Sequence, residues 1–454
     1  MRPNMTRFAA KYVAGLLATV LLAACPATLT AQLPEEIEPI EAPFEMPQMV
    51  RPAFPDRTLS IAKTGAKQGK LSTKAIQKAI DRTAAKGGGT VIVPAGKWLT
   101  GRIELKSNVN LRIDEGAELH FSGQVDDYLP AVPTRNEGVD IISTGAMVYA
   151  NGAKNIAITG KGRLVAPRRD CQLMRRAIGG ISDSVEQMPL AERVFDGRGG
   201  AKVFLPAFFG PINCEQILVE GVTFERSLFW NIVPVYCRNI IIRGVTVNSH
   251  GHGRTDGIDL DSSADALIEY TTLDCGDDCF TLKAGRGNDG VDRARPTENV
   301  VIRHCRVKRG VGGLTIGSET AGGIHNVYAY DVVMEAPRYP IYMKTRRPRG
   351  GGCENITLER LHVKSCAGTA IQFDMLGSRR WVGSLADRLP AQQVGKLTPK
   401  FADITFKDVT IDSCRTLISA KGLPEQPIEN LTLHNVKAPT TRMTLQDVGT
   451  ITIK

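Results

Sequence analysis

The chain has 454 residues, of which 42% are hydrophobic and 45 are glycine, and this is enough for one large turn-rich domain or two ordinary domains. Its formal net charge of +10 at pH 7 suits an anionic partner such as an acidic plant or algal polysaccharide, although a basic surface also serves solubility alone. The basic residues show neither the aromatic interleaving nor a motif of nucleic-acid-binding proteins, so nucleic acid is not an expected partner.

Residues 1–31 are typical of a signal peptide. Basic residues precede an apolar run at 13–24 that is too short for a good membrane span. Cleavage after Ala31 is one interpretation, and a lipobox that leaves the protein lipid-anchored through Cys25 is the other. No later stretch is long and apolar enough to span a membrane, so we expect an exported protein, either periplasmic or extracellular.

Two short segments follow the signal. Residues 32–57 are rich in Pro and Glu and are expected to form a linker or an extended N-terminal arm. Residues 72–86 place Ala and Ile at helical spacing and are followed by three glycines, which predicts one amphipathic helix. We expect this helix to cap one end of the domain that follows.

The rest of the chain repeats a polar residue, three mostly β-forming residues, a turn and a second short strand. From Gln216 to Asn355 the copies are 23 to 33 residues apart, counting a degenerate copy at Ala266. This period indicates an all-β solenoid of parallel strands, since each copy can bury its apolar face only against its neighbours. A β-sandwich would not keep the polar residue in register, which recurs at Asn155, Gln216, Asn239, Asn299, Asn326, Asn355, Asp403 and Asn430.

We therefore predict a single solenoid domain over residues 57–454, interrupted by insertions at about 165–213 and 376–400 that flank the binding face. Of the ten cysteines, nine follow Cys25, and an odd number argues against a simple disulfide framework. Stacked core thiols or local disulfides remain the alternatives. Cys275 and Cys279 lack the two-residue gap of a zinc knuckle, so no metal is expected there.

The stretch CGDDC at residues 275–279 sets Asp277 and Asp278 side by side. Asp256 lies 21 residues before Asp277, close to one coil of the solenoid, and neighbouring strands stack about 4.8 Å apart. Three carboxyl groups on adjacent coils push their pKa values apart, so that one stays protonated while others are ionised, as glycosidic cleavage requires. A calcium site or a solvated acidic turn would use the same oxygens, and the spacing alone does not separate these alternatives.

An ordered set of motifs resembles the polygalacturonase family, glycoside hydrolase family 28, over most of the chain after the signal. The set comprises STKAIQKAID, GGGTVIVPAGKWLTG, LKSNVNLRIDEGAEL, TDGIDLDSS, CGDDCFTLKAGR, GGLTIGSE and KTRRPRGG. The resemblance implies a right-handed parallel β-helix and an inverting glycosidase that cuts α-galacturonosidic bonds of pectin without a metal or other cofactor. It also implies that Asp277 is the general acid and that Asp256 and Asp278 activate water.

Three positions depart from the family pattern. Arg254 stands where the family has Asn, Val311 where it has His, and Tyr342 where it has Arg, whereas Lys344 is retained. In the family, that Arg and Lys grip the carboxylate of galacturonate on the leaving-group side, and Tyr does not replace a bidentate guanidinium. We expect Lys344, Tyr342, Arg254 and Arg346 to bind the substrate.

The departures have two interpretations. Rhamnogalacturonan hydrolases, which are relatives within the family, also lack that His and Arg, and Tyr342 would stack on their neutral rhamnose. Alternatively, neighbouring groups substitute: an arginine of 346–349 for the missing guanidinium, and His250 or His252 for the missing imidazole. The histidines are more typical of simple loop residues.

The leading functional interpretation is thus an exported hydrolase of pectic polysaccharide, taken as a monomer by default. A Ca²⁺-dependent lyase on the same solenoid is the second, and the hydrolase motif set argues against it. A non-catalytic carbohydrate-binding solenoid is the third. Asp256, Asp277 and Asp278 argue against a mere binding protein, which has little need for three crowded carboxylates.

Overall fold

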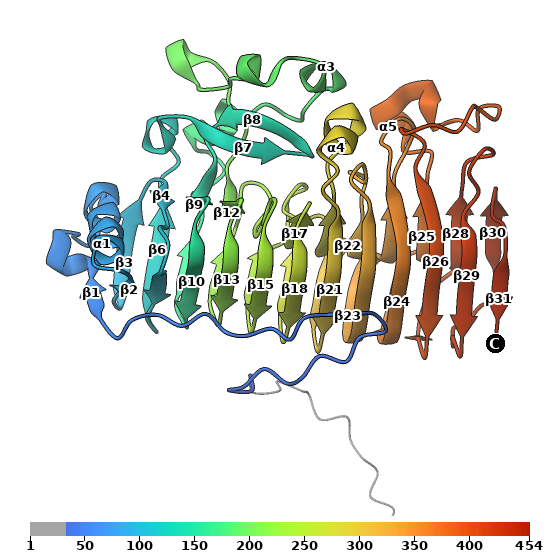
Figure 1. Cartoon of the computed structure of the whole chain (residues 1–454), viewed down its shortest axis with the longest axis horizontal. Coiled ribbons are helices and arrows are strands. Elements are labelled where there is room, and N and C mark those ends of the chain that lie inside the picture. The colour runs from blue at the N-terminus through green and yellow to red at the C-terminus, as the bar shows by residue number, and fades with distance from the viewer. Residues whose placement is uncertain (1–32) are drawn as a thin grey trace, which may run out of the picture. The chain divides into compact units, whose positions relative to one another are not determined.

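The structure is a computed structural model that describes residues 33–454 (Figure 1). The expected signal and Cys25 lie outside the described residues. Residues 35–454 form one compact unit, a right-handed parallel β-helix whose coils each contribute strands to three faces. The prediction of an all-β solenoid of parallel strands is confirmed.

Each face is a ladder of parallel strands, one from each coil. The first face contains β1 (Thr58–Ser60), β2 (Gly89–Val93), β5 (Val109–Ile113), β10 (Lys154–Gly160), β13 (Glu215–Glu220), β15 (Arg238–Arg243), β18 (Ala264–Glu269), β21 (Thr297–Arg303), β26 (Lys400–Lys407), β29 (Glu429–His434) and β31 (Ile451–Ile453). The second face contains β3 (Gly96–Thr100), β6 (Ala117–Phe121), β11 (Arg163–Val165), β14 (Thr223–Glu225), β16 (Thr246–Ser249), β19 (Thr272–Cys275) and β27 (Thr410–Ile411).

The third face carries the residues that the sequence singled out. It contains β4 (Ile103–Glu104), β9 (Ala146–Asn151), β12 (Ala207–Ile212), β17 (Ile258–Asp261), β20 (Phe280–Lys283), β25 (Thr369–Asp374), β28 (Thr416–Lys421) and β30 (Met443–Gln446). Three long strands bend around corners and contribute to more than one face: β22 (Arg306–Ile316), β23 (Ile324–Lys344) and β24 (Gly352–Val363).

The repeated polar residue sits where the chain turns into the first face. Asn155, Asn299, Asn326 and Asn355 all have positive φ, between 54° and 57°, a left-handed conformation that Asn tolerates better than most residues. Their side chains also bond from coil to coil, as in Asn326 to Asn299 at 3.0 Å and Asn355 to Asn326 at 2.7 Å. The same residue type therefore serves both the backbone conformation and the stacking.

The core fills the inside of the coils. Isoleucine, valine and leucine stack in register from one coil to the next, as in the fully buried column through Ile217, Ile240, Ala266 and Val300. All nine described cysteines are free, and most are buried, so they contribute packing and not cross-links. Aligned columns of this kind bury the apolar side of every coil against its two neighbours.

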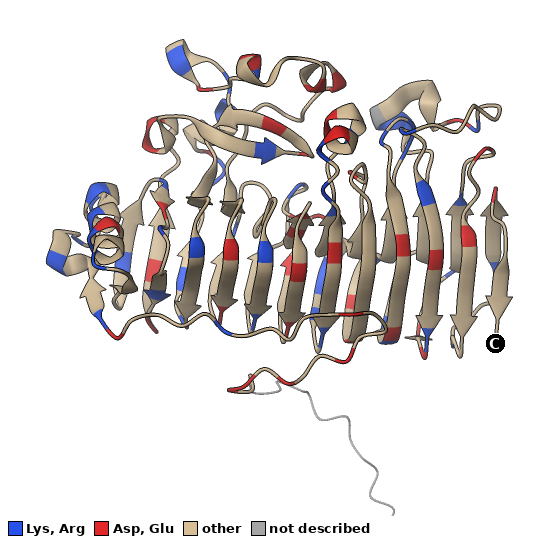
Figure 2. Ribbon diagram, viewed as in Figure 1, with Lys and Arg blue, Asp and Glu red and all other residues tan. Residues whose placement is uncertain are grey.

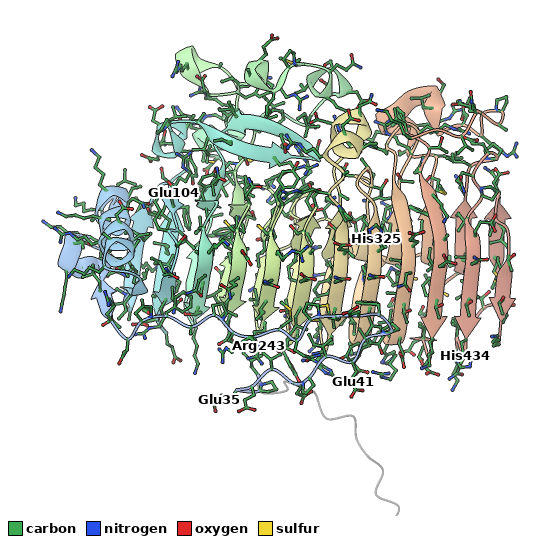
Figure 3. All side chains as sticks on the ribbon, viewed as in Figure 1. Glu35, Glu41, Glu104, Arg243, His325 and His434 are labelled. Atoms are coloured by element: carbon green, nitrogen blue, oxygen red, sulfur yellow. The ribbon has the colours of Figure 1, made fainter. Side chains whose placement is uncertain are left out.

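Residues 35–57 form an arm that runs along the outside of the first face (Figure 1). Ile40 and Met49 are buried against an outward-facing apolar column of that face, whose members are Ala157, Leu218, Ile241, Leu267, Val301 and Tyr328. Arg243 donates hydrogen bonds to the carbonyls of Glu35 and Glu36, and Figure 3 shows Arg243 beside the arm. The Pro/Glu-rich segment is therefore docked on the β-helix over this stretch.

Helices and loops decorate the ends of the coils. Helix α1 (Thr73–Ala85) buries Ile76, Ala79 and Ile80 at the N-terminal end of the β-helix, as predicted. The hairpin β7 (Val132–Asn136) and β8 (Val139–Ser143) lies along one side with the remaining short helices (Figure 1). These are η2 (Val125–Tyr128), α2 (Gln172–Arg175), α3 (Asp183–Glu186), η3 (Leu190–Glu192), η4 (Arg198–Gly200), α4 (Gly287–Arg293), α5 (Arg379–Val382) and η5 (Gly383–Ala386). The remaining short helix, η1 (Ile61–Thr64), lies beside α1 at the N-terminal end.

Candidate active site

The strand register brings the three aspartates onto neighbouring coils of the third face. Ile258 of β17 pairs with Phe280 of β20, and the amide of Gly257 donates to the carbonyl of Asp278 at 2.9 Å, so Asp256 and Asp278 lie side by side. Gly312 occupies the same place on the next coil. A Cβ there would lie 2.6 Å from Oδ1 of Asp278, so glycine leaves that carboxylate its space.

Asp277 is held by the loop that precedes β17. Its Oδ2 accepts a 2.7 Å hydrogen bond from the backbone amide of Arg254. Burial, and then the neighbouring carboxyl of Asp278, raise the pKa of Asp277. A carboxyl group with a raised pKa keeps its proton at higher pH and can donate it.

Asp256 is 3% exposed, and its Oδ1 is buried without a hydrogen-bond partner in the protein. Burial, and then the charges of Asp259 and Asp277, raise the pKa of Asp256 well above its ordinary value. Its backbone carbonyl accepts a 2.8 Å bond from Nδ2 of Asn231, which fixes the strand around it. This oxygen can therefore accept a hydrogen bond from a water molecule or a substrate hydroxyl.

Asp278 differs from the other two because it makes an ion pair. Nζ of Lys344, at the end of β23, lies 2.7 Å from Oδ2 of Asp278. Oδ1 of Asp278 is buried and has no partner in the protein, like Oδ1 of Asp256. Lys344 also sits over the ring of Tyr342, 4.6 Å from the centroid, so these residues contact one another as a set.

Sequence reasoning missed a second layer of charges behind the aspartates. Asp259 is fully buried with both oxygens unpartnered, and burial raises its pKa well above the ordinary value. Nζ of Lys283 lies 3.7 Å from Asp259 and 3.2 Å from Glu319. The pKa of Glu319 is lowered although burial opposes this, because the cations of Lys283 and then Arg349 outweigh burial.

A signal for this layer was present in the strand register. Lys283 and Asp261 are paired residues on β20 and β17, in the column that Lys344 continues two coils later. Charged residues that recur at one column of a stacked face meet there, because side chains at equivalent positions project on the same side. The motif TDGIDLD that begins at Thr255 contains two further aspartates, Asp259 and Asp261.

Two expected substrate-binding arginines have partners inside the protein. Nη2 of Arg254 pairs with Glu137 at the tip of the β7–β8 hairpin at 2.7 Å, and its guanidinium stacks 4.8 Å from the ring of Phe229. Nη2 of Arg346 lies 3.2 Å from Oδ2 of Asp183, in the insertion. The Arg254 side chain thus braces the loop whose amide holds Asp277.

Neither His250 nor His252 has a described side-chain hydrogen bond to any of the three aspartates of the site. Nδ1 of His250 lies 3.0 Å from the carbonyl of Cys275, and His252 is exposed. The backbone amide of Val311 donates a hydrogen bond to the carbonyl of Asp277 at 2.8 Å. Their interpretation as loop residues fits this placement.

Residues 196–448 match the family described as "Glycosyl hydrolases family 28". The chain belongs to glycosyl hydrolase family 28. A probable polygalacturonase of Vitis vinifera is 28% identical over 375 residues, which span 81% of this chain and 70% of that protein. An endo-polygalacturonase of Pectobacterium carotovorum is 25% identical over 81% of this chain and 84% of its own length.

A solved exopolygalacturonase structure superposes on most of the β-helix. The exopolygalacturonase of Thermotoga maritima matches with a TM-score of 0.78 at 27% identity, over 89% of this chain and 94% of that one. The polygalacturonase of Erwinia carotovora, at 20% identity and a TM-score of 0.65, shares the fold. The protein is therefore a glycosidase by family.

Within residues 33–454, no group of three or more His, Cys, Asp or Glu side chains is arranged to hold a metal ion. The same part of the chain contains no helix long and apolar enough to cross a membrane.

Proposed function

We propose that this family 28 protein is an exported, inverting hydrolase of α-galacturonosidic bonds in pectic polysaccharide. One observation carries the proposal: Asp277, whose pKa is raised, lies beside Asp278, whose carboxylate is paired with Lys344. A proton donor next to an ionised carboxylate is what glycosidic hydrolysis requires. The names of the relatives, which are polygalacturonases from plants and bacteria, support the choice of substrate.

In this mechanism Asp277 donates its proton to the glycosidic oxygen as the bond to the leaving sugar breaks. Asp256 and Asp278 each present an unpartnered oxygen on the same face, and these oxygens bind the attacking water. The carboxylate of Asp278, which is paired with Lys344, takes the proton of that water, and Asp256 joins it at pH values above its own raised pKa. Attack from the side opposite the leaving group inverts the anomeric carbon. The general acid, Asp277, is held by a loop, whereas the two water-activating aspartates, Asp256 and Asp278, lie on stacked coils. The two functions are therefore positioned by different elements.

Lys344 is the residue we assign to the acidic sugar. Although burial opposes it, the charge of Asp278 raises the pKa of Lys344, so the amine stays protonated across the working range. An ammonium group can pair with Asp278 and with one further carboxylate, because it has three donors. A galacturonate next to the scissile bond supplies that carboxylate.

The test is release of reducing ends by the purified protein from polygalacturonan and rhamnogalacturonan in parallel, with a chelator present and Asp277→Asn as the control. We expect release that survives the chelator and is lost in the variant. Products with a new double bond that form only with Ca²⁺ would indicate a lyase instead. Binding without any cleavage would indicate a carbohydrate-binding solenoid.

Rhamnogalacturonan is the second candidate substrate, because of Tyr342. The ring centroid of Tyr342 lies 4.9 Å from that of Tyr339. Tyr342 stands where the family pattern has an arginine, whose guanidinium would bind the carboxylate of a second uronate. Burial raises the pKa of Tyr342 to about 12, so the phenol stays protonated and offers a flat apolar face with a donor, which suits a neutral sugar. Preferential cleavage of rhamnogalacturonan, shifted toward polygalacturonan in Tyr342→Arg, would select this candidate.

Export is part of the proposal and is tested separately. Fractionation of cells that express the full chain should place the protein in the periplasm or medium. Mass spectrometry of its N-terminus then distinguishes cleavage after Ala31 from lipidation of Cys25.

A further inference from the structure

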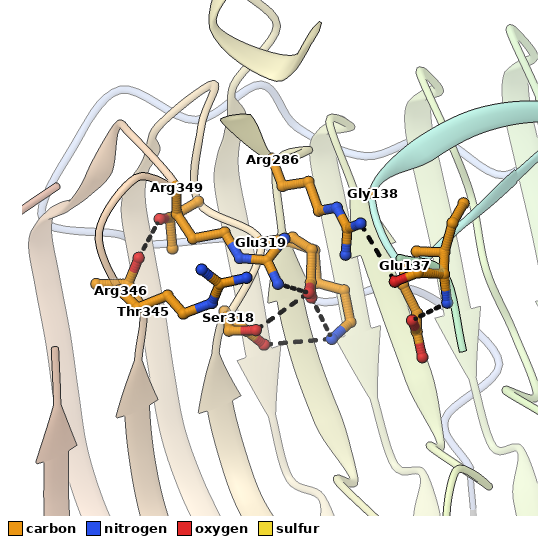
Figure 4. Close-up of polar contacts among 12 residues, drawn as sticks. Glu137, Gly138, Arg286, Ser318, Glu319, Thr345, Arg346 and Arg349 are labelled. Atoms are coloured by element: carbon orange, nitrogen blue, oxygen red, sulfur yellow. Dashed lines mark hydrogen bonds and ion pairs between the residues drawn. The ribbon is translucent and has the colours of Figure 1, made fainter. Parts of the chain in front are cut away.

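Three arginines gather just beyond the ends of the third-face strands. Arg286 follows β20, and Arg346 and Arg349 follow β23 two coils later, so they reach one edge of the face that carries Asp278 and Lys344, on either side of the coil that carries Glu319. Figure 4 shows them around the loop that holds Glu319, with Arg349 pointing toward that carboxylate. Arg286 and Arg349 are 2% and 8% exposed, so two guanidinium groups are largely removed from water here.

The buried carboxylate of Glu319 is shared between two cations of this region. Glu319 lies 3.2 Å from Lys283 and 3.7 Å from Arg349, so one carboxylate serves two cations. Nε of Arg286 and Nε of Arg349 are buried without a hydrogen-bond partner. Burial also lowers the pKa of Arg349 to about 10, which marks a cation that its surroundings stabilise poorly.

Two carboxylates of the insertion complete the cluster, and the first is Glu186 of α3, which lies 3.4 Å from Nε of Arg286. Asp183 of α3 lies 3.2 Å from Arg346 and 3.4 Å from Arg286. Although partial burial opposes it, the charges of Arg346 and then Arg286 lower the pKa of Asp183. The Asp183 side chain is nevertheless 60% exposed, whereas those of Arg286 and Arg346 are 3% and 11% exposed. A solvent-exposed carboxylate on a surface loop therefore rests on guanidinium groups that belong to the β-helix.

A neighbouring pair shows what a purely structural ion pair looks like in the same loop. Arg347 makes two hydrogen bonds of 2.5 Å to Glu425, and both side chains are buried, at 11% and 3% exposure. That pair is closed to an external ligand. The Asp183 contact is open on the carboxylate side, and Asp183, Arg346 and Arg349 line a cavity of about 160 Å³.

We propose that Arg286, Arg346 and Arg349 form a carboxylate-binding subsite for a uronate residue of the substrate, and that Asp183 is its internal occupant, which the substrate carboxylate replaces. Arg346 follows Lys344 by two residues, roughly 7 Å of extended chain, so the subsite adjoins the catalytic residues. Planar guanidinium groups suit a carboxylate because they donate two parallel hydrogen bonds. The inference rests on the proposed function, since it concerns how the same site binds an acidic polysaccharide.

The test measures binding without turnover. In an Asp277→Asn background, calorimetry gives the dissociation constants of trigalacturonate and of its methyl ester. We expect Arg346→Gln and Arg349→Gln each to weaken trigalacturonate binding at least tenfold and to leave binding of the ester within twofold. Asp183→Asn should tighten trigalacturonate binding at least threefold, because it removes the competing carboxylate. The matched control is the double variant Arg347→Gln/Glu425→Gln, which removes the closed pair and should change neither constant.

Equal weakening of the acid and the ester by the arginine variants would overturn the subsite. Unchanged or weaker binding in Asp183→Asn would show that Asp183 is a structural latch and would overturn its role as occupant. Thermal unfolding of each variant identifies any loss that comes from folding, and Arg346→Lys, which keeps the charge, then serves in place of Arg346→Gln. Reducing-end release by the wild type is scored independently, so arginine-dependent binding without cleavage would retain the subsite and refute the proposed hydrolase.

Discussion

The first and third faces of the β-helix are formed by the same stacked coils, but they differ in how their buried charged side chains are partnered. On the first face, Glu269 lies between two arginines, with Arg243 at 2.8 Å from one oxygen and Arg303 at 2.8 Å from the other. Figure 2 shows basic and acidic residues alternating across β13, β15, β18 and β21. On the third face, Asp259 has two buried oxygens without a hydrogen-bond partner, and Asp256 and Asp278 have one each.

This difference indicates that the first face mainly stabilises the β-helix and that the third face mainly provides functional groups. The first face satisfies its charges and covers its apolar column with the arm, through Ile40 and Met49. The third face leaves polar atoms unsatisfied, which costs stability and provides groups that can bind water or substrate. Substitutions on the first face should therefore reduce stability and spare activity, and those on the third face should do the reverse.

The largest expected effect is on the third face. Asp277→Asn should lower kcat/KM about a thousandfold, or about 4 kcal/mol of transition-state stabilisation, because it removes the general acid. The melting temperature should not fall, since the variant removes one of three crowded acids. Asp274→Asn is the matched control, because Asp274 lies three residues earlier on the second face and pairs with Arg309. A drop in activity of similar size in the control would contradict the assignment.

The next effect is on the first face. Glu269→Gln should lower the free energy of unfolding by about 3 kcal/mol, because it leaves two buried guanidinium groups without their shared carboxylate. Denaturant unfolding measures this loss, and kcat/KM of the folded variant should stay within twofold of the wild type. Loss of activity at unchanged stability would contradict the expectation that first-face substitutions reduce stability and spare activity.

The arm should contribute a smaller amount. Ile40→Ala should cost about 2 kcal/mol of unfolding free energy, because Ile40 is 6% exposed and packs on the apolar column of the first face. Val50→Ala is the control, since Val50 is 81% exposed in the same arm and should change stability by less than about 0.5 kcal/mol. Equal effects of the two substitutions would mean that the arm does not hold to this face in solution.

The smallest effect is a shift in pH dependence. The charge of Asp259 raises the pKa of Asp256, so Asp259→Asn should lower it, and Asp256 should ionise at lower pH. If Asp256 acts as a base, the acid limb of kcat/KM against pH should then move to lower pH by less than about one unit. The alkaline limb, assigned to Asp277, should move less. An acid limb that stays in place would exclude this coupling between Asp259 and Asp256.

Much of the fold and the centre of the site could be predicted from local patterns. The recurring Asn positions predicted the coils because Asn both adopts the left-handed turn and bonds to its counterpart in the next coil. The 21-residue spacing from Asp256 to Asp277 is one residue short of the 22-residue coil, whose register sets Asp256 beside Asp278, so the stacking brought the aspartates together. Such predictions succeed because a solenoid converts sequence period directly into spatial adjacency.

The partners of Arg254 and Arg346 could not be predicted in the same way. Glu137 and Asp183 come from a hairpin and an insertion that interrupt the period, so no spacing relates them to the arginines. The docking of the arm is a similar case, because Ile40 meets residues more than a hundred positions away. The sequence by itself determined the coils and the aspartates they stack, because those contacts repeat from coil to coil. Only the tertiary structure decided which charges are paired and which stay open, because that depends on irregular segments folding back over the faces.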